Sequence, residues 1–165
     1  MLYVSEYNSI LGDMLMASDG NSLIGLWFKG QKYFASTLNE EFEKKELEIF
    51  KETKKWLDIY FSGVKPDFDL SISFIGTPFQ KSVWKILVDI PYGKTITYGE
   101  ISKILAKKRN IKSMSSQAVG NAVGHNPISI IVPCHRVIGS NGELTGYAGG
   151  IDKKRKLLKL EGINI

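Results

Sequence analysis

The chain has only one cysteine and two histidines among its 165 residues, and this scarcity excludes several classes of protein. A single thiol cannot form an internal disulfide, so disulfides do not stabilise the fold. A zinc site would need further nitrogen or sulfur ligands, which two histidines in separate segments do not supply, so we expect no bound metal and no cofactor. Charged residues or glycines interrupt every apolar run well before the roughly 20 residues that a membrane-spanning helix needs.

The N-terminal segment MLYVSEYNSI also lacks the basic start and the apolar stretch of a signal peptide. We therefore expect a cytoplasmic protein with no membrane partner. The apolar content of 43% is that of a globular protein, and the length suits one ordinary domain or two small ones.

The net charge of +5 is distributed unevenly along the chain. Residues 1–75 contain 8 Lys and Arg against 12 Asp and Glu, whereas residues 76–165 contain 14 against 5. The first part thus carries about −4 and the second about +9. A basic part of this kind either faces a polyanion or has a solvated, lysine-rich surface.

The first part predicts a small sheet and one helix. Apolar and polar residues alternate over residues 10–34 around two turns, which predicts short antiparallel strands. Residues 39–63 have apolar residues at helical spacing, with Asn39 as the expected N-cap and Gly63 beyond the end. Residues 68–76 alternate again and predict a strand that leads into a linker. This part contains no chemical motif.

Helix-start signals dominate the second part. Thr77 with Gln80, and Thr97 with Glu100, have the spacing of capping boxes, so we expect helices from 77 to about 90 and from 97 onwards. A third helix follows a basic loop, begins near residues 115–116 and stops before Pro127. The last two helices resemble a helix-turn-helix with a long connecting loop.

The third helix is rich in small residues, including Gly120 and Gly124, and each glycine lowers helix stability by about 1 kcal/mol relative to alanine. Two explanations are open. The helix backbone approaches another helix closely, or a slim helix enters a narrow groove of DNA.

The remaining segments predict a strand at residues 128–132, which Pro133 ends, a hairpin at Asn141-Gly142, and a final basic helix capped by Asp152 and closed by Gly162.

The lone thiol, Cys134, lies in the segment IIVPCHRVIG next to His135 and Arg136. These neighbours could raise the thiolate fraction, which is only a few per cent for an ordinary cysteine at neutral pH. Adjacent residues of a strand point to opposite faces, so contact between the thiol and the imidazole requires either a bend after Pro133, which the proline favours, or a bridging water. Without further context, a buried structural cysteine is the alternative.

Further motifs accompany this segment: NP before the cysteine, GYAGG after it, the closing KLLKLEG, and GTPFQKSVWKIL with IPYGKTITYGEIS upstream. Together they resemble the O6-alkylguanine-DNA alkyltransferase family, also called methylated-DNA:protein-cysteine methyltransferases. The resemblance implies an α+β fold with a ribonuclease-H-like α/β support domain (residues 1–75) and a winged helix-turn-helix domain (residues 76–165) that carries the cysteine.

The resemblance also implies the activity. Such a protein moves the alkyl group of O6-alkylguanine, and possibly of O4-alkylthymine, from double-stranded DNA to its own cysteine, acts once, and is a monomer that binds the minor groove and flips the damaged nucleotide. Cys134 would be the acceptor, and His135 with Glu161 would activate it through a water. Asn126 would bridge the structural elements around the thiol. Tyr98 would assist protonation of the departing guanine. The residues implied in binding DNA or the guanine are Gln117, Ala118, Gly120, Arg136, Tyr147, Ala148, Gly149 and Lys154.

One position departs from the family pattern, because most relatives have an arginine where this chain has Gln117. That arginine fills the gap left by the flipped base, and we hypothesise that Arg109 or Lys112 in the preceding loop supplies part of the missing charge. The alternative functions are an alkylation-damage sensor, a helix-turn-helix regulator with a structural thiol, and a cysteine hydrolase. Sensors of this type have another residue in place of the cysteine, so the presence of Cys134 argues against a sensor.

Overall fold

The computed structural model describes residues 1–38 and 41–165 and divides into two compact units. One unit comprises Met1–Ile75 with Pro127–Ser129, and the other comprises Gly76–Asn126 with Ile130–Ile165. Within the described ranges, no helix is both long and apolar enough to cross a membrane. The mixture of a sheet-containing unit and a helical unit agrees with the predicted α+β class.

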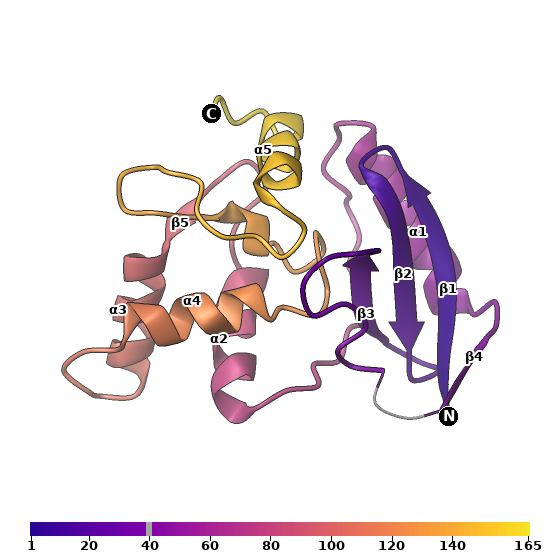
Figure 1. The fold of residues 1–165 in the computed structure, drawn as a ribbon, viewed down its shortest axis with the longest axis horizontal. Coiled ribbons are helices and arrows are strands. Elements are labelled where there is room, and N and C mark those ends of the chain that lie inside the picture. The colour runs from indigo at the N-terminus through magenta and orange to yellow at the C-terminus, as the bar shows by residue number, and fades with distance from the viewer. Residues whose placement is uncertain (39–40) are drawn as a thin grey trace. The chain divides into compact units, whose positions relative to one another are not determined.

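The first unit is built on a four-stranded sheet with the order β3-β2-β1-β4. Its strands are β1 (Leu2–Ser9), β2 (Gly12–Ser18), β3 (Leu23–Phe28) and β4 (Phe42–Lys44). The three long strands are antiparallel neighbours, and β4 pairs in parallel with β1. Helix α1 (Glu48–Phe61) packs on the sheet (Figure 1). There Phe61 stacks on Tyr7, and Asp58 accepts a hydrogen bond from the Tyr7 hydroxyl at 2.6 Å. Of the antiparallel strands predicted within residues 10–34, β2 and β3 are confirmed, whereas residues 32–37 form turns.

The helix predicted for residues 39–63 is wrong in its first part. Phe42–Lys44 form β4, and the helix begins only at Glu48. The backbone explains this: Leu2 N–H donates to the Glu41 carbonyl at 3.1 Å, and Lys45 N–H donates to the Val4 carbonyl at 3.2 Å. These sheet hydrogen bonds outweigh the helical pattern. The predicted N-cap, Asn39, lies outside the described residues.

Two predicted strands are reduced to single bridges. In residues 68–76 only Ile72 pairs, with Leu23, and in residues 128–132 only Ile128 pairs, with Leu26. The second segment cannot continue as a strand because Ile130 has a φ of 69°, which turns the backbone into the left-handed region.

The second unit contains α2 (Pro78–Val88), α3 (Tyr98–Lys108), α4 (Ser116–Gly124) and α5 (Ile151–Leu160), with the short parallel pair β5 (Ile96–Thr97) and β6 (Val137–Ile138). Both predicted capping boxes are present, and the Ser115 side chain caps α4 by accepting a hydrogen bond from Ala118 N–H. The Trp84 indole N–H of α2 donates to the Ala122 carbonyl of α4 at 2.8 Å, which fixes these helices against each other.

Two smaller predictions for this unit need correction. Asn141-Gly142 does form a turn, in which Gly142 N–H donates to the Gly139 carbonyl and Gly139 N–H donates to the Glu143 carbonyl. However, β6 pairs with β5, and no strand is assigned between this turn and α5. The predicted hairpin is therefore reduced to a closed turn. Helix α5 begins one residue before Asp152, which lies in its first turn, and Gly150 occupies the N-cap position.

Candidate active site

The chain bends at Pro133, which is the first of the two arrangements considered for the thiol and the imidazole. Residues Cys134–Arg136 form a 3-10 helix, η1, instead of continuing the extended segment, and Arg136 N–H donates to the Pro133 carbonyl at 3.0 Å. The alternation of a strand therefore no longer separates the thiol from the imidazole. The predicted bend is confirmed.

The Cys134 thiol is buried, with 7% of the residue exposed. Burial raises its pKa, because the thiolate loses hydration, whereas a hydrogen bond from the Asn126 side chain and the positive charge of Lys154 favour the thiolate and act in the opposite direction. Asn126 is held in place because its Nδ2 donates to the Val132 carbonyl at 2.8 Å. The resting group is a neutral thiol whose surroundings are arranged to accept the anion.

The two residues after Cys134 converge on one buried carboxylate. His135 Nε2 lies 2.6 Å from one oxygen of Glu161, and Arg136 Nε donates to the other at 2.8 Å. The second oxygen also accepts a hydrogen bond from the Gly93 N–H at 2.9 Å, and the Arg136 guanidinium donates to the Ile90 carbonyl at 2.7 Å. All three side chains are at most 9% exposed.

This network sets the state of the imidazole. Burial lowers the pKa of His135, and this effect exceeds the opposing attraction of the Glu161 carboxylate. A neutral imidazole whose Nε2–H donates to Glu161 has its lone pair on Nδ1. His135 can therefore take up a proton at Nδ1, and the neighbouring carboxylate then stabilises the resulting cation.

Arg136 was expected to contact DNA or the guanine, but the structure places it in the interior. We expected it on the binding surface, but its side chain is only 9% exposed and is occupied by Glu161 and the Ile90 carbonyl. An unpaired carboxylate in the interior would be costly, and Arg136 provides its counter-charge. In this structure it orients the carboxylate partner of the histidine and does not face solvent.

Lys154 and Tyr98 meet at the loop that follows the turn at 139–143. The buried Lys154 ammonium donates to the carbonyls of Thr145 and Gly146 at 3.0 and 3.1 Å, and lies 6.0 Å from the centre of the Tyr98 ring. The Tyr98 hydroxyl donates to the same Thr145 carbonyl at 2.9 Å. Burial lowers the pKa of Lys154 to about 8 and raises that of Tyr98.

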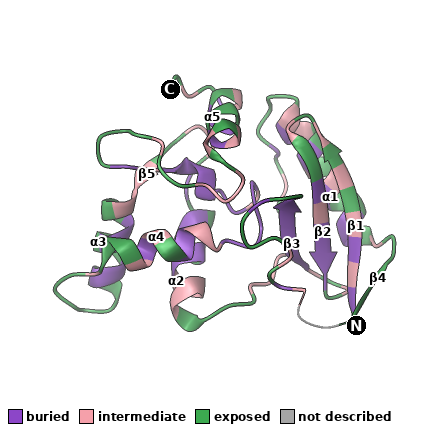
Figure 2. Cartoon of the chain, in the orientation of Figure 1, coloured by how far each residue is buried: buried purple, intermediate pink, exposed green. Residues whose placement is uncertain are grey.

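The remaining predicted residues lie on α4 and on the loop. Gln117 is exposed near the start of α4, whereas Val119, Ala122 and Val123 form the buried side of this helix (Figure 2). Ala118 and Gly120 are partly exposed. Tyr147, Ala148 and Gly149 are partly buried in the loop that leads to α5.

Several backbone groups of this site could not be identified from the sequence. The carbonyls of Ile90, Thr145 and Gly146 and the N–H of Gly93 each bind a predicted side chain. Every residue has a backbone carbonyl, so no sequence signal identifies these acceptors. Only Gly93 could be recognised from its residue type, because the turn here requires a φ of 76°, which glycine adopts readily.

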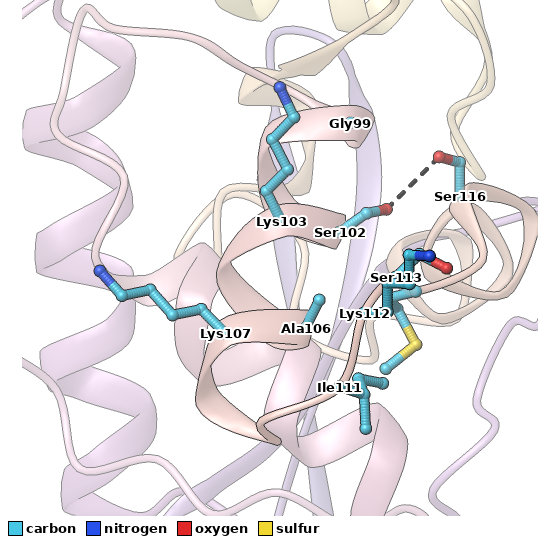
Figure 3. Close-up of a pocket in the computed structure, with 10 residues that line it drawn as sticks. Gly99, Ser102, Lys103, Ala106, Lys107, Ile111, Lys112, Ser113 and Ser116 are labelled. Carbon is cyan, nitrogen blue, oxygen red and sulfur yellow. Dashed lines mark hydrogen bonds between the residues drawn. The ribbon is translucent and has the colours of Figure 1, made fainter.

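The loop before α4 forms one side of a cleft of about 520 Å³ against α3. The Ser102 and Ser116 hydroxyls lie 3.4 Å apart across it, and Lys103 and Lys107 extend away from the loop segment (Figure 3). Arg109, at the end of α3, reaches back to α2, where its Nη2 lies 3.5 Å from Ser82 Oγ. Of the two residues hypothesised to supply charge near Gln117, Arg109 thus contacts α2, whereas Lys112 lines this cleft together with Ser116.

Comparison with known proteins matches both parts of the chain to one family. Residues 78–163 match the family model described as 6-O-methylguanine DNA methyltransferase, DNA binding domain, and residues 2–74 match the ribonuclease-like domain of the same description. These matches agree with the predicted fold class, in which a ribonuclease-like part precedes a DNA-binding part.

Individual relatives are similar over nearly their whole length. A Methanosarcina acetivorans protein named methylated-DNA–protein-cysteine methyltransferase is 46% identical, with 98% of this chain and 99% of the relative covered. The Mycobacterium tuberculosis protein of the same name is 42% identical, with 98% of this chain and 93% of the relative covered. Among solved structures, Mycobacterium tuberculosis OGT in complex with DNA has a TM-score of 0.82 at 41% identity, covering 96% of this chain and 92% of that one.

Proposed function

The chain belongs to the 6-O-methylguanine DNA methyltransferase family, and we propose accordingly that it repairs DNA by transferring the alkyl group of O6-alkylguanine to its own Cys134. The observation that carries the proposal is the buried thiol, within reach of an amide donor and a buried cation and directly followed by a histidine paired with a carboxylate. We infer that α4 enters the minor groove, that the protein acts as a monomer and that it is cytoplasmic.

The proposed reaction begins with proton removal from the thiol. His135 accepts the proton of Cys134 at Nδ1 through a water, and Glu161 stabilises the imidazolium that forms. The Asn126 amide and the Lys154 ammonium stabilise the thiolate, because both favour the charged form of Cys134. Arg136 keeps Glu161 charged and oriented.

Transfer is a single displacement. The sulfur forms a bond to the alkyl carbon while the bond between that carbon and guanine O6 breaks, and its electron pair stays with the guanine. Tyr98, whose raised pKa keeps its hydroxyl protonated, gives a proton to the departing base. The proton that His135 took from the thiol then restores the Tyr98 hydroxyl. The products are a thioether and guanine, and the protein is consumed because thiols do not cleave the thioether.

The binding part of the proposal assigns the guanine pocket to the loop of Tyr147, Ala148 and Gly149. Lys154 holds the start of this loop by its two carbonyl contacts. Base flipping brings the nucleotide out of the duplex, at a cost of a few kcal/mol. Gln117, Ala118 and Gly120 of α4 would contact the groove.

The proposal is tested by mixing the protein with duplex DNA that contains O6-methylguanine and counting lesions removed per protein molecule. We expect at most one, and none for Cys134→Ala. Binding of the damaged duplex without removal of the lesion would indicate a sensor, and continued turnover would indicate a hydrolase; either result would contradict the proposal.

A further inference from the structure

A separate basic cleft lies between α2 and the C-terminal end of α3, with a volume of about 490 Å³. Four of its lining residues are cationic: Lys81, Lys85, Lys108 and Arg109. The other lining residues are Pro78, Ser82 and Leu105. Within the part of the chain that the structure describes, no carboxylate lines this cleft and none of the four cations forms an ion pair.

Helix stability does not explain the whole arrangement. Lys108 and Arg109 lie at the end of α3 and Lys85 lies in the last turn of α2, where the helix dipole favours cations. Lys81 has no such support, because it lies near the start of α2. Lys81 and Lys85 are also four residues apart on one helix face and repel each other. This repulsion lowers the stability of α2 unless an anion offsets it.

Arg109 adds a preorganised donor to the cleft. Its guanidinium carbon lies 5.2 Å from the centre of the Phe79 ring, and its Nη2 lies 3.5 Å from Ser82 Oγ. These contacts orient a group whose planar donors match the oxygens of a phosphate. An oriented guanidinium among three lysines is suited to a phosphodiester.

We propose that this cleft binds a backbone phosphate of the duplex on which the protein acts, as a contact distinct from α4. The inference rests on the proposed function, since it assigns the same DNA to a second surface. Both walls of the cleft pack on α4: Trp84 of α2 binds the Ala122 carbonyl, and Ser102 of α3 contacts Ser116. Phosphate contacts of this kind fix position without reading sequence.

The test measures binding of undamaged duplex over a range of salt concentrations. For Lys81→Ala/Lys85→Ala we expect the plot of log affinity against log salt to become less steep by about 0.9 for each phosphate that the variant no longer neutralises. Lys81→Arg/Lys85→Arg keeps the charge and should keep the slope. Lys51→Ala/Lys65→Ala, which changes two exposed lysines of the other unit, is the matched control and should also keep it.

Methyl transfer from free O6-methylguanine base, measured on the same variants, separates this inference from the proposed function. The Lys81→Ala/Lys85→Ala variant should react with the free base at the unaltered rate. An unchanged salt slope, with transfer intact, would overturn the second phosphate site alone. If the unaltered protein neither accepts methyl groups nor binds duplex, the proposed function and this inference both fail.

Discussion

Among the individual residues, Glu161 is the group on which the site depends. It accepts hydrogen bonds from His135, Arg136 and the Gly93 backbone, and none of its side chain is exposed. Removing the charge of Glu161 leaves the buried Arg136 guanidinium without its counter-ion. We therefore expect the loss of this charge to lower both the stability of the fold and the rate of alkyl transfer.

The substitution Glu161→Gln should lower the free energy of unfolding by about 3–5 kcal/mol, which is the usual effect of breaking a buried ion pair. Urea unfolding measures it. The matched control is Glu46→Gln, which removes the exposed ion pair with Lys54 and should change stability far less. Equal unfolding midpoints for the two variants would show that the buried network contributes nothing special.

Asn126 offers a test through pH. Its hydrogen bond lowers the pKa of Cys134, while burial raises it. In Asn126→Ala the thiol pKa should rise further, so the reactive thiolate appears only at higher pH. The pH profile of transfer from free O6-methylguanine, and of thiol alkylation by iodoacetamide, should both move to higher pH. Asn164→Ala, at an exposed position, is the control; a profile that stays in place in Asn126→Ala would refute this role.

Residue types predicted the backbone at Cys134 well and the surroundings of the neighbouring side chains less well. The order of Cys134 and His135 after a proline indicated a bend, and the structure confirms it. The position of Arg136 could not be predicted, because the sequence alone does not distinguish an arginine that faces DNA from one that is paired inside the fold. Its burial follows from where Glu161 arrives, at the far end of α5.

Among the helices and strands, α4 has glycines that packing does not require. A Cβ at Gly120 would meet only the Tyr98 ring, at 3.9 Å, and a Cβ at Gly124 would meet nothing within 4 Å. Close approach to another helix therefore does not explain them. For Gly120 we propose the other explanation, a slim helix for a DNA groove.

Gly120→Ala should consequently raise the free energy of unfolding by up to about 1 kcal/mol, from helix propensity, and weaken binding to duplex DNA. Thermal unfolding and duplex affinity are measured on the same samples. Gly124→Ala, at the far end of the helix, should stabilise without weakening binding. If Gly120→Ala left duplex affinity intact, the placement of α4 in the groove would be wrong.

Gln117 is exposed on α4, at the position where the resemblance to the family implies an arginine. Gln117→Arg should speed repair of O6-methylguanine in duplex DNA and leave reaction with the free base unchanged, because only the duplex needs the gap in the base stack filled. Single-turnover rates with the duplex and with the free base test this prediction. Equal acceleration on both would mean that position 117 acts on the chemistry and not on flipping.

Helices were more predictable than strands in this chain. The starts of α2 and α3 follow from capping boxes, which are local and need only four residues. Strand β4 is exposed at all three residues and exists through backbone pairing with β1, so no apolar pattern identifies it. In β1 only Leu2 and Val4 are buried, too short an alternation to detect.

Across the molecule as a whole, charge and chemistry are concentrated in the same part of the chain. All of the proposed site residues lie in Gly76–Asn126 and Ile130–Ile165, the unit that also carries the excess of lysine and arginine. The thiol is the only one in the chain, so an alkyl group found as a thioether on cysteine has one possible position.

The central claim is that Cys134 is the permanent acceptor of the alkyl group. The most direct measurement is the intact mass of the protein after incubation with duplex DNA containing O6-methylguanine, followed by peptide mapping. The account predicts a gain of one methyl group per molecule, on the peptide that contains Cys134, and no gain for Cys134→Ala. An unchanged mass while the lesion disappears, or a methyl group on another residue, would contradict it.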